Sequence, residues 1–582
     1  MVSCPWVLKR GLPCAALAAV LIFPAQAGAR ELLVPGVTHA RERIFNGGRP
    51  VVLHVVKTPP PSELYSLLPV RAGGGEVRRQ SVPAMQKRLS SEATTVGING
   101  DFFNLETGHP TGLFLRHGLI SARPHPRRSA LALGLDGRLL VDLFGFDATW
   151  QAGTGTLRRV HDLNRPIESG SSRVGLFTPP WGTRTPRARG AVEVVLTGFR
   201  KARLDTDLSG TVAAVKRDGR TLIPPGGAVL QARGTKRQAL LARGAVGTTI
   251  TVRLDVPELP TGTLHAIGGG PTLVQNGQPV PQAHQGFSSA HTHRRHPRTA
   301  VGQLANGRLL FVVADGRSSQ SHGLRTGALA SVMADRGAVT AMAFDGGGSS
   351  TIAFEGRVLN RPSDGTPRQV ANGLFLHYYG IYAPAPGGGI LSPNGDGVGD
   401  RKKLKAKIVK RSDIHLRLLR PDGSVAWSRR DVVRPGWIKR VVSNPGMANG
   451  RWRWVVEATA TATGAHTQMN RGFTVNKTLG HLRLSDSLVR LKPRRDARLD
   501  ASVTVTRSAR LDVEVLGADG RVRRVLFEGE RGPGRHSWRW NGRNAAGELV
   551  RSGTYTIRVV AHNELGAVSL RRSVRVVRIT RG

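Results

Sequence analysis

Cysteine, acidic residues and aromatic rings are all scarce in this chain of 582 residues. Its two cysteines are Cys4 and Cys14, so the long remainder has neither a disulfide nor thiolate chemistry. Aromatic residues make up only 5 %, which leaves few stacking platforms for single-stranded nucleic acid. After the N-terminal segment no run of about 18 apolar residues occurs, so no membrane span is predicted there.

The N-terminal segment has the pattern of a secretory signal peptide. Lys9 and Arg10 form a positive start, residues 11–23 are mostly apolar but too few to span a bilayer, and residues 25–27 (Ala-Gln-Ala) offer a small-residue cleavage site. We therefore expect residues 1–27 to be removed on export, together with both cysteines. The mature protein is expected to be secreted or held in the cell envelope.

Basic residues outnumber acidic ones by more than two to one. Lys and Arg total 85 against 39 Asp and Glu, a formal charge of +46, and 71 of the basic residues are arginine. Such a charge favours adhesion to polyanions. The basic residues are scattered rather than gathered in a block, and no nucleic-acid motif occurs. We predict a solvated basic surface, with an anionic cell-envelope polymer as a candidate partner and no specific nucleic acid.

One Pro- and Gly-rich segment divides the chain. Residues 383–389 (Ala-Pro-Ala-Pro-Gly-Gly-Gly) lack side chains that could build a core, which is typical of a linker. They follow an expected domain at residues 28–382. We predict that this domain is α+β, because strand-like runs and a segment with helical spacing both occur in it.

The C-terminal part repeats itself after 97 or 98 residues. Asp-Gly at 422–423 recurs at 519–520, and Pro-Gly at 435–436 recurs at 533–534. Short runs of alternating apolar and polar residues with Asp-Gly turns between them favour β-hairpins. We predict two immunoglobulin-like β-sandwiches, which occupy residues 390–478 and 479–582.

A strand–helix–strand unit is predicted in the first domain. Residues 309–313 are a buried-strand run, residues 323–336 have helical spacing, and residues 341–344 form a second strand. The two strands are expected to be parallel neighbours joined by a right-handed crossover. Asp315 and Asp345 follow these strands, so both carboxylates should reach one sheet edge, where α/β proteins bind ligands.

Two motifs carry most of the candidate chemistry. In segment 345–350 (Asp-Gly-Gly-Gly-Ser-Ser) the glycines permit positive φ and close approach of a ligand, and successive backbone N–H groups could form an anion nest. In segment 99–103 (Asn-Gly-Asp-Phe-Phe) the two phenylalanines should anchor the turn in the core and so fix its Asn and Asp. The alternative for each motif is a plain tight turn.

Arginine and histidine side chains nearby are weaker candidates. Arg298 and Arg368 could bind phosphate bidentately, although a solvated surface arginine is the alternative for each. His291, His293 and His296 we interpret as a surface cluster, with a metal pair as the alternative.

The start of the first predicted sandwich offers oxygen ligands for Ca²⁺ in Asn394, Asp396 and Asp400. Val398 occupies a ligand position of the EF-hand pattern, however, and no Glu closes the loop. A structural turn is therefore the favoured interpretation.

In combination and in order, these motifs resemble the phosphodiester glycosidase family over roughly residues 40–380. The sandwiches resemble FlgD-type immunoglobulin-like modules, which often open with the Ser-Pro-Asn-Gly-Asp-Gly found at residues 392–397. The second sandwich has a different opening at residues 492–495. The pieces that carry the first resemblance are residues 98–103, Gly112-Leu113, Gly268-Gly269-Gly270-Pro271, residues 296–302, Asp315-Gly316-Arg317, residues 345–350, residues 360–364 and residues 368–372.

The resemblance implies hydrolysis of a sugar-1-phosphodiester at the sugar–phosphate linkage of a cell-surface or extracellular glycan, such as an exopolysaccharide. A leaving phosphate monoester is a stable anion, and a carboxylate can activate water or stabilise an oxocarbenium-like sugar. Asp101, Asp315 and Asp345 would take these catalytic roles, and which aspartate takes which role is left open. A divalent cation (Ca²⁺) between them is also left open. Substrate binding would fall to Asn99, Arg298, Thr299, Arg317, Gly346, Gly347, Gly348, Ser349, Ser350, Arg368 and Asn372.

The alternative function is a non-catalytic cell-envelope protein with the same fold. It would bind an anionic polysaccharide or wall polymer without turnover. An alanine at Asp345 would then leave binding intact.

Overall fold

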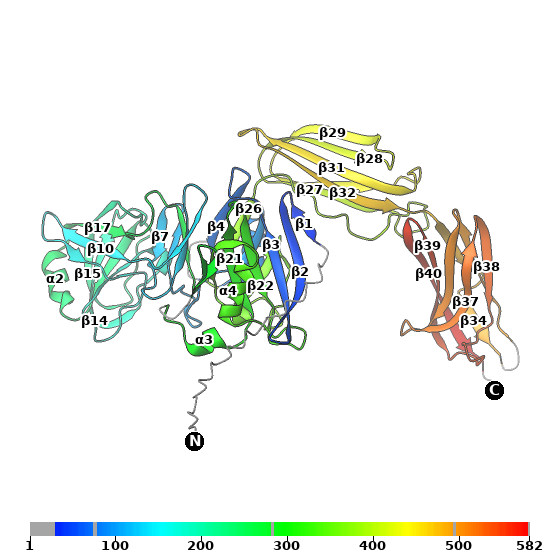
Figure 1. The fold of residues 1–582 in the computed structure, drawn as a ribbon, viewed down its shortest axis with the longest axis horizontal. Helices are drawn as coiled ribbons and strands as arrows, with labels where there is room; N and C mark the ends of the chain where they lie inside the picture. Colours follow the sequence, from blue (N-terminus) through cyan, green and yellow to red (C-terminus); the bar gives the residue numbers. More distant parts are fainter. Residues whose placement is uncertain (1–29, 74–77, 281–284, 493–495, 580–582) are drawn as a thin grey trace, which may run out of the picture.

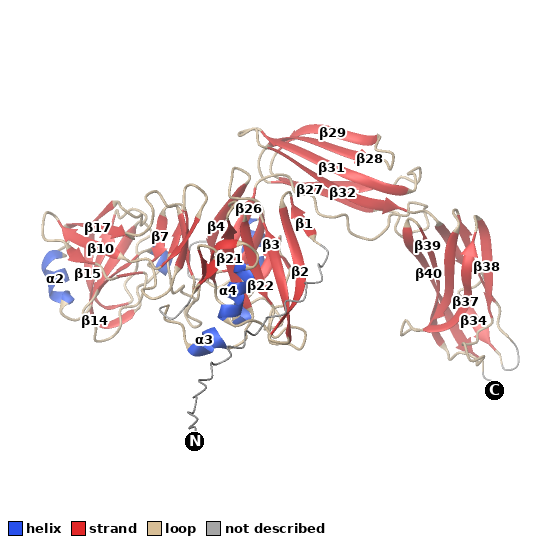
Figure 2. Ribbon diagram, in the orientation of Figure 1, coloured by secondary structure: helices blue, strands red, loops and turns tan. Residues whose placement is uncertain are grey.

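The computed structural model describes residues 30–73, 78–280, 285–492 and 496–579. The expected signal peptide and both cysteines lie outside these residues. Strands dominate the described part (Figure 2), whose α-helices are α1 (Val82–Leu89), α2 (Lys236–Arg243), α3 (Ser289–His293) and α4 (Thr326–Ala334). The predicted α+β class is therefore corrected to mostly β, because the helices are few and short beside the strands. No helix in these ranges is both long and apolar enough to cross a membrane.

Two facing sheets form the centre of the first domain (Figure 1). Val56 and Phe311 of the larger sheet share one apolar core with Ile98 and Leu374 of the smaller. The larger sheet has the order β1 (Glu31–Val34), β2 (Val37–Asn46), β3 (Arg49–Lys57), β22 (Leu309–Ala314), β21 (Arg298–Leu304), β23 (Ala338–Ala343), β19 (Thr272–Gln275) and β20 (Gln278–Pro279). The smaller has the order β25 (Arg357–Val358), β24 (Ile352–Phe354), β5 (Thr94–Asn99), β26 (Asn372–Tyr378) and β4 (Tyr65–Arg71).

Helices cover the outer faces of this pair of sheets. Leu329 and Met333 of α4 pack on the larger sheet, and Met85 and Leu89 of α1 pack on the smaller. The centre is thus a helix–sheet–sheet–helix stack, in which one apolar stripe of each helix is buried.

The predicted strand–helix–strand unit exists as β22–α4–β23, but its strands are not neighbours. β21 lies between them and pairs antiparallel with both. The reason is the Asn306-Gly307 turn, which joins β21 to β22 as a hairpin and inserts β21 into the unit. β22 and β23 still end at one edge, about 10 Å apart at the usual strand spacing, with Arg298 at the start of β21 between them.

A second β-rich body is inserted between β9 and β18 and shares a core with the sheet that contains them. It extends to one end of the molecule (Figure 1), and α2 packs on it through Leu240. The connecting sheet has the order β7 (Leu119–Ala122), β6 (Phe114–Arg116), β18 (His265–Gly268), β8 (Ala130–Leu133) and β9 (Leu139–Asp142). The inserted sheet has the order β11 (Arg158–Arg159), β10 (Asp147–Ala152), β17 (Thr249–Asp255), β15 (Asp207–Gly219), β14 (Arg187–Thr197), β16 (Gly227–Ala232), β13 (Val174–Phe177) and β12 (Asp162–Leu163).

The first sandwich is docked on the central sheets. Ala383, at the start of the predicted linker, is fully buried, and Lys407 of β27 reaches Glu355 at 2.6 Å. The expectation that the segment builds no core is therefore wrong at its first residue. The sheets are β27 (Lys402–Ile408) with β30 (Gly436–Val442), and β29 (Val425–Val433), β28 (Ser412–Leu419), β31 (Gly450–Ala460) and β32 (His466–Val475).

The second sandwich repeats the strands of the first and adds β33 and β34. β28 and β36 begin 97 residues apart, and β30 and β38 begin 98 residues apart, which confirms the repeat. Its sheets are β33 (Leu479–Leu484), β35 (Leu499–Val505) and β38 (Gly534–Trp540), and β34 (Leu488–Leu491), β40 (Gly566–Arg578), β39 (Gly553–Asn563), β36 (Ala509–Leu516) and β37 (Val522–Arg531).

Candidate active site

Asp101 lies in a turn after β5 and is almost fully buried. Its Oδ2 accepts a hydrogen bond from the backbone N–H of Gly112 at 2.6 Å, and its own N–H donates to Asn372 Oδ1 at 2.8 Å. Burial raises the pKa of Asp101 to about 7, although Gly112 and the charge of Arg128 oppose the rise. The carboxyl is therefore fixed in place and can hold a proton near neutral pH.

Asp345 begins the glycine loop after β23. Ser349 Oγ donates to its Oδ2 at 2.6 Å, and its backbone N–H donates to the carbonyl of Gly100 at 3.1 Å. Burial raises the pKa of Asp345 to about 6, while Ser349 and the charge of Arg368 lower it. The bond to Gly100 ties this loop to the turn after β5, and the charge of Asp345 contributes to the raised pKa of Asp101.

Asn99 joins the two loops. Its Nδ2 donates to the carbonyl of Asp345 at 2.7 Å, and its Oδ1 accepts from Thr299 Oγ1 at 2.8 Å and from the N–H of Thr351 at 3.1 Å. Because these polar atoms are used inside the protein and both Asn99 and Thr299 are fully buried, the two residues position the Asp345 loop. Their contact with substrate remains a prediction.

Backbone hydrogen bonds occupy three N–H groups of the predicted anion nest. The backbone N–H groups of Gly347, Ser349 and Ser350 all donate to backbone carbonyls, at 2.9–3.2 Å. The loop closes into a short 3₁₀ turn, η2 (Gly347–Ser349), which uses the N–H groups of Ser349 and Ser350, so these donors are not available to an anion. Of its three glycines, Gly347 has a positive φ, +60°, and Gly346 does not.

Arg128 is a site residue that sequence analysis missed. Its guanidinium lies 4.9 Å from the ring centroids of both Phe102 and Phe287, and its charge acts on Asp101 and Asp345. Local sequence does not distinguish it from the other arginines, and only the folded chain brings its charge close enough to act on the two carboxyls.

Phe102, Phe287 and His291 form a ring cluster beside Arg128. The centroids of Phe287 and His291 lie 4.9 Å apart in a stacked arrangement, and those of Phe102 and Phe287 lie 5.4 Å apart. The prediction that both phenylalanines anchor the turn in the core is confirmed for Phe103 and wrong for Phe102, which is only half-buried. His291 likewise belongs to this cluster rather than to a separate surface patch.

Unpartnered polar atoms collect around the two aspartates. Ser350 Oγ, Asn372 Nδ2 and Arg128 Nε are buried and have no hydrogen-bond partner. Buried polar atoms are normally paired, so such atoms mark a place where a bound molecule could supply the missing partners.

Arg368 and Arg317 border the glycine loop. Arg368 donates from Nε to Asp364 Oδ2 at 2.9 Å and approaches Ser349 Oγ at 3.5 Å. Arg317 is exposed, and its Nη2 lies 2.9 Å from where a Cβ on Gly347 would stand. Both guanidinium groups are therefore placed for a phosphate bound over the loop.

Arg298 is used differently from the prediction. It is nearly fully buried, and it donates to the carbonyls of Leu324 at 2.9 Å, His291 at 2.5 Å and Arg294 at 3.1 Å. Burial lowers its pKa to about 10. In this structure Arg298 therefore fixes the segment that carries the His291 ring. The guanidinium N–H groups that would bind a phosphate are used for these carbonyl contacts.

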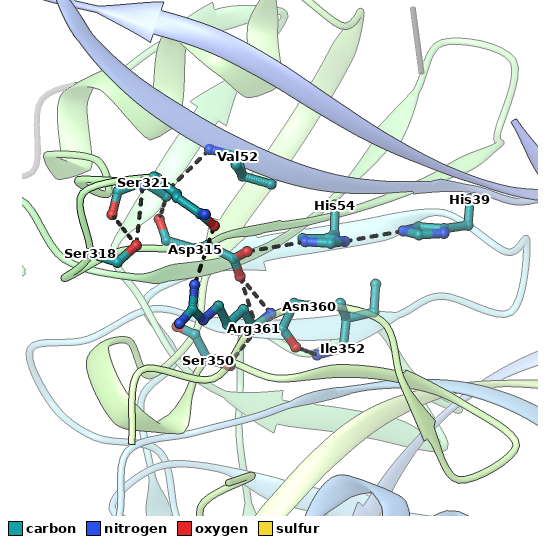
Figure 3. A network of polar contacts seen from close by, with 11 residues as sticks. His39, Val52, His54, Asp315, Ser318, Ser321, Ser350, Ile352, Asn360 and Arg361 are labelled. Carbon is teal, nitrogen blue, oxygen red and sulfur yellow. Dashed lines mark hydrogen bonds and ion pairs between the residues drawn. The ribbon is translucent and has the colours of Figure 1, made fainter. Parts of the chain in front are cut away.

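Asp315 lies in a polar network with His54, Asn360 and Arg361 (Figure 3). Its Oδ2 lies 3.2 Å from His54 Nε2, His54 Nδ1 lies 3.2 Å from His39 Nε2, and Asp315 Oδ1 accepts from the N–H of Arg361 at 2.9 Å. Asn360 bridges Asp315 Oδ1 and the carbonyl of Ser350, at 3.3 and 3.1 Å. The structure thus brings Asp101 and Asp345 together, and it connects Asp315 to the Ser350 carbonyl through Asn360. A catalytic role of Asp315 remains a prediction.

The candidate calcium loop is closed by its own backbone. Asp400 accepts from the N–H groups of Asn394, Gly395 and Gly397 at 2.7–3.0 Å, and Asn394 donates to the carbonyl of Leu479 at 2.6 Å. These bonds support the interpretation as a structural turn that links the two sandwiches.

A divalent cation between the aspartates remains a prediction. No group of three or more His, Cys, Asp or Glu side chains converges as metal ligands within the described ranges. Asp101 and Asp345 have the positive charge of Arg128 beside them instead.

Comparison with known protein families identifies two types of domain in the chain. The sequence model of the phosphodiester glycosidase family matches residues 200–377, and that of the FlgD Ig-like domain matches residues 494–564. The chain therefore contains a phosphodiester glycosidase-type domain and, after it, an FlgD-type Ig-like domain. The first match includes Asp345 and Arg368, whereas Asp101 and Arg128 precede it.

Individual relatives are similar over part of the chain. N-acetylglucosamine-1-phosphodiester alpha-N-acetylglucosaminidase of Mus musculus is 27 % identical over 175 residues, 28 % of this chain and 34 % of its own. The SPbeta prophage-derived uncharacterized protein YomE of Bacillus subtilis is 35 % identical over 117 residues, 20 % of this chain and 18 % of its own. The chain thus spans about a third of the one relative and a fifth of the other.

A solved structure shares the fold. The crystal structure of a hypothetical protein from Synechocystis aligns with a TM-score of 0.53 at 23 % identity, over 61 % of this chain and 64 % of that one.

Proposed function

We propose that this chain is exported and hydrolyses the sugar–phosphate bond of a glycosyl-1-phosphodiester on an extracellular or cell-surface glycan. The observation that carries the proposal is the pair Asp101 and Asp345, two buried carboxyls with raised pKa values held by backbone contacts. Arg128, Arg317 and Arg368 supply positive charge beside the pair. The family match over residues 200–377 supports the same class of reaction.

The mechanism that we propose divides the work between the two carboxyls. Asp345 ionises above about pH 6 and takes a proton from water as the water oxygen bonds to the anomeric carbon. The bond between that carbon and the ester oxygen breaks, and the phosphate monoester leaves with the electron pair. Asp101 keeps its proton up to about pH 7 and donates it as a hydrogen bond to the departing ester oxygen.

The arginines act on charge that builds up on the phosphate. Arg128 has an unpaired Nε and its charge acts on both aspartates, and Arg317 and Arg368 border the glycine loop. Preorganised donors of this kind stabilise charge that develops in the transition state, most strongly where water is excluded. Ser350 and Asn372, with their unpaired polar atoms, would hold the sugar hydroxyls.

The test is release of sugar from a panel of sugar-1-phosphodiesters that includes UDP-N-acetylglucosamine and N-acetylglucosamine-1-phospho-methylmannoside. Asp345→Asn should lower kcat/KM by about 10³, and Asp207→Asn, an exposed carboxyl on β15, should not. A chelator arm tests metal dependence. Absence of turnover on every sugar, with retained binding of an anionic polysaccharide, would replace the hydrolase by the non-catalytic binding protein.

A further inference from the structure

An arginine-lined cleft of about 580 Å³ lies between the connecting sheet and the inserted body. Leu143, Phe144 and Phe146 form its apolar side. Its charged and titratable lining residues are Arg123, Arg159, His161, Asp162, Arg165, Glu168 and Arg173. The cleft is therefore a basic hollow with one apolar wall.

Asp162 holds two of these arginines in fixed positions. It is buried, and its two carboxylate oxygens accept from Arg123 Nε at 2.8 Å and Arg173 Nε at 2.9 Å. A single negative charge thus orients two positive ones. No carboxylate in the described part of the chain forms an ion pair with Arg159 or Arg165, so even with Glu168 at the rim the lining keeps a formal charge of +2.

His161 adds a neutral donor to the cleft. Its Nδ1 accepts from the backbone N–H of Val174 at 3.1 Å, so the neutral ring carries its hydrogen on Nε2. Burial and the charge of Arg173 lower the pKa of His161, which keeps it in this form. An anion in the cleft would meet guanidinium groups and this N–H.

The cleft is close to the candidate active site. Arg123 lines it, and the charge of Arg128 acts on Asp101; the five residue steps from Arg123 to Arg128 span at most about 18 Å. The charge of Arg165 also acts on Arg128. A smaller cleft of about 200 Å³ continues from Arg165 to the loop at residues 104–111, which follows the Asp101 turn.

We propose that this cleft binds a second phosphate of the same substrate, one or two units away from the scissile bond. Guanidinium groups are suited to phosphate, and the apolar wall is suited to the apolar face of a sugar ring. The substrate class is then a glycan with repeated sugar–phosphate units rather than a small phosphodiester. This inference rests on the proposed function for the place of the scissile bond.

The kinetic test compares an oligomer of sugar-1-phosphate units with a matched single-unit methyl phosphodiester, at about 0.15 M salt to screen distant charge. The ratio of kcat/KM on the oligomer to that on the single unit should fall about tenfold in Arg159→Glu. The matched control is Arg217→Glu, an exposed arginine on β15 of the same sheet, which changes the net charge equally. Equal ratios in the two variants would overturn the inference.

A binding test separates this inference from the catalytic one. Calorimetry with inorganic tripolyphosphate should give about tenfold weaker binding to Arg159→Glu than to Arg217→Glu. If the wild type turns over no sugar phosphodiester but this difference is present, the proposed reaction fails and the anion site stands. If turnover is present and both variants bind tripolyphosphate alike, the cleft is not a phosphate site.

Discussion

At the residue scale, the carboxyls of Asp101 and Asp345 determine the expected pH dependence. Their pKa values are raised by burial to about 7 and about 6, so the pair holds one proton between these values. Below this window Asp345 is protonated, and above it Asp101 loses its proton. A steady-state profile of kcat/KM should therefore peak between pH 6 and 7 and fall about tenfold per unit on either side. A rate that keeps rising above pH 7 would contradict this assignment.

Arg128 is expected to tune both carboxyls. Its positive charge lowers the pKa of each, so Arg128→Met should move both limbs of the pH profile to higher pH. The loss of a charged donor should also lower kcat by about 10². The control is Arg127→Met, at the exposed neighbouring residue. If the pH profile of the Arg128 variant is not shifted, the charge of Arg128 does not affect the reacting carboxyls.

Gly348 leaves room for the Arg368 side chain. A Cβ at this position would stand 2.0 Å from Arg368 Nη2 and 2.2 Å from Asp364 Oδ2. These atoms are the ends of flexible side chains, so Gly348→Ala should displace the guanidinium without unfolding the loop. We expect KM to rise about tenfold with an unchanged melting temperature. Gly226→Ala, whose Cβ would meet nothing within 4 Å, should change neither, and an unaltered KM in Gly348→Ala would remove Arg368 from substrate binding.

At the element scale, α4 connects the two strands that end near Asp315 and Asp345. Gly327 is exposed in its first turn, and a Cβ there would meet nothing within 4 Å. Gly327→Ala should therefore stabilise the protein by about 0.5–1 kcal/mol, because alanine loses less backbone entropy in a helix. Thermal unfolding measures this change, and a lower melting temperature would show that the glycine has a packing role.

The hairpin formed by β21 and β22 explains the largest topological difference from the prediction. Helical spacing in residues 323–336 identified α4, and the apolar runs identified β22 and β23. The Asn306-Gly307 turn is a strong short-range signal for a hairpin. The prediction that β22 and β23 are neighbours leaves this hairpin out. Pairing between strands that are distant in the sequence depends on how the faces of the whole sheet pack. The local sequence alone therefore did not place β21 between β22 and β23.

At the scale of the whole molecule, Lys407 joins the first sandwich to the central sheets. Its side chain is 2 % exposed, and it bonds Glu355 at 2.6 Å and the carbonyl of Ala93 at 3.0 Å. Lys407→Ala leaves Glu355 without its cation, so we expect a loss of about 3 kcal/mol in the free energy of unfolding. Denaturant unfolding measures it beside Lys405→Ala, an exposed residue of the same strand. Equal stabilities of the two variants would show that the docking does not depend on this pair.

The sequence by itself determined the local features. The 97-residue repeat, the alternation in its strands and the Asp-Gly turns are short-range patterns, and they predicted both sandwiches. The order of small motifs likewise indicated the phosphodiester glycosidase resemblance and picked out Asp101 and Asp345. These signals survive in the sequence because backbone period and turn chemistry act between residues close in the chain.

Only the tertiary structure decided which side chains meet. It brought Arg128 over the Phe102 ring, placed Asp315 against His54, and used Arg298 to hold backbone carbonyls. It also docked the first sandwich through Lys407. Each of these outcomes depends on burial and on partners more than a few residues away. A buried charged side chain points toward the partner that compensates for its loss of water. The neighbouring residues in the sequence do not specify that partner.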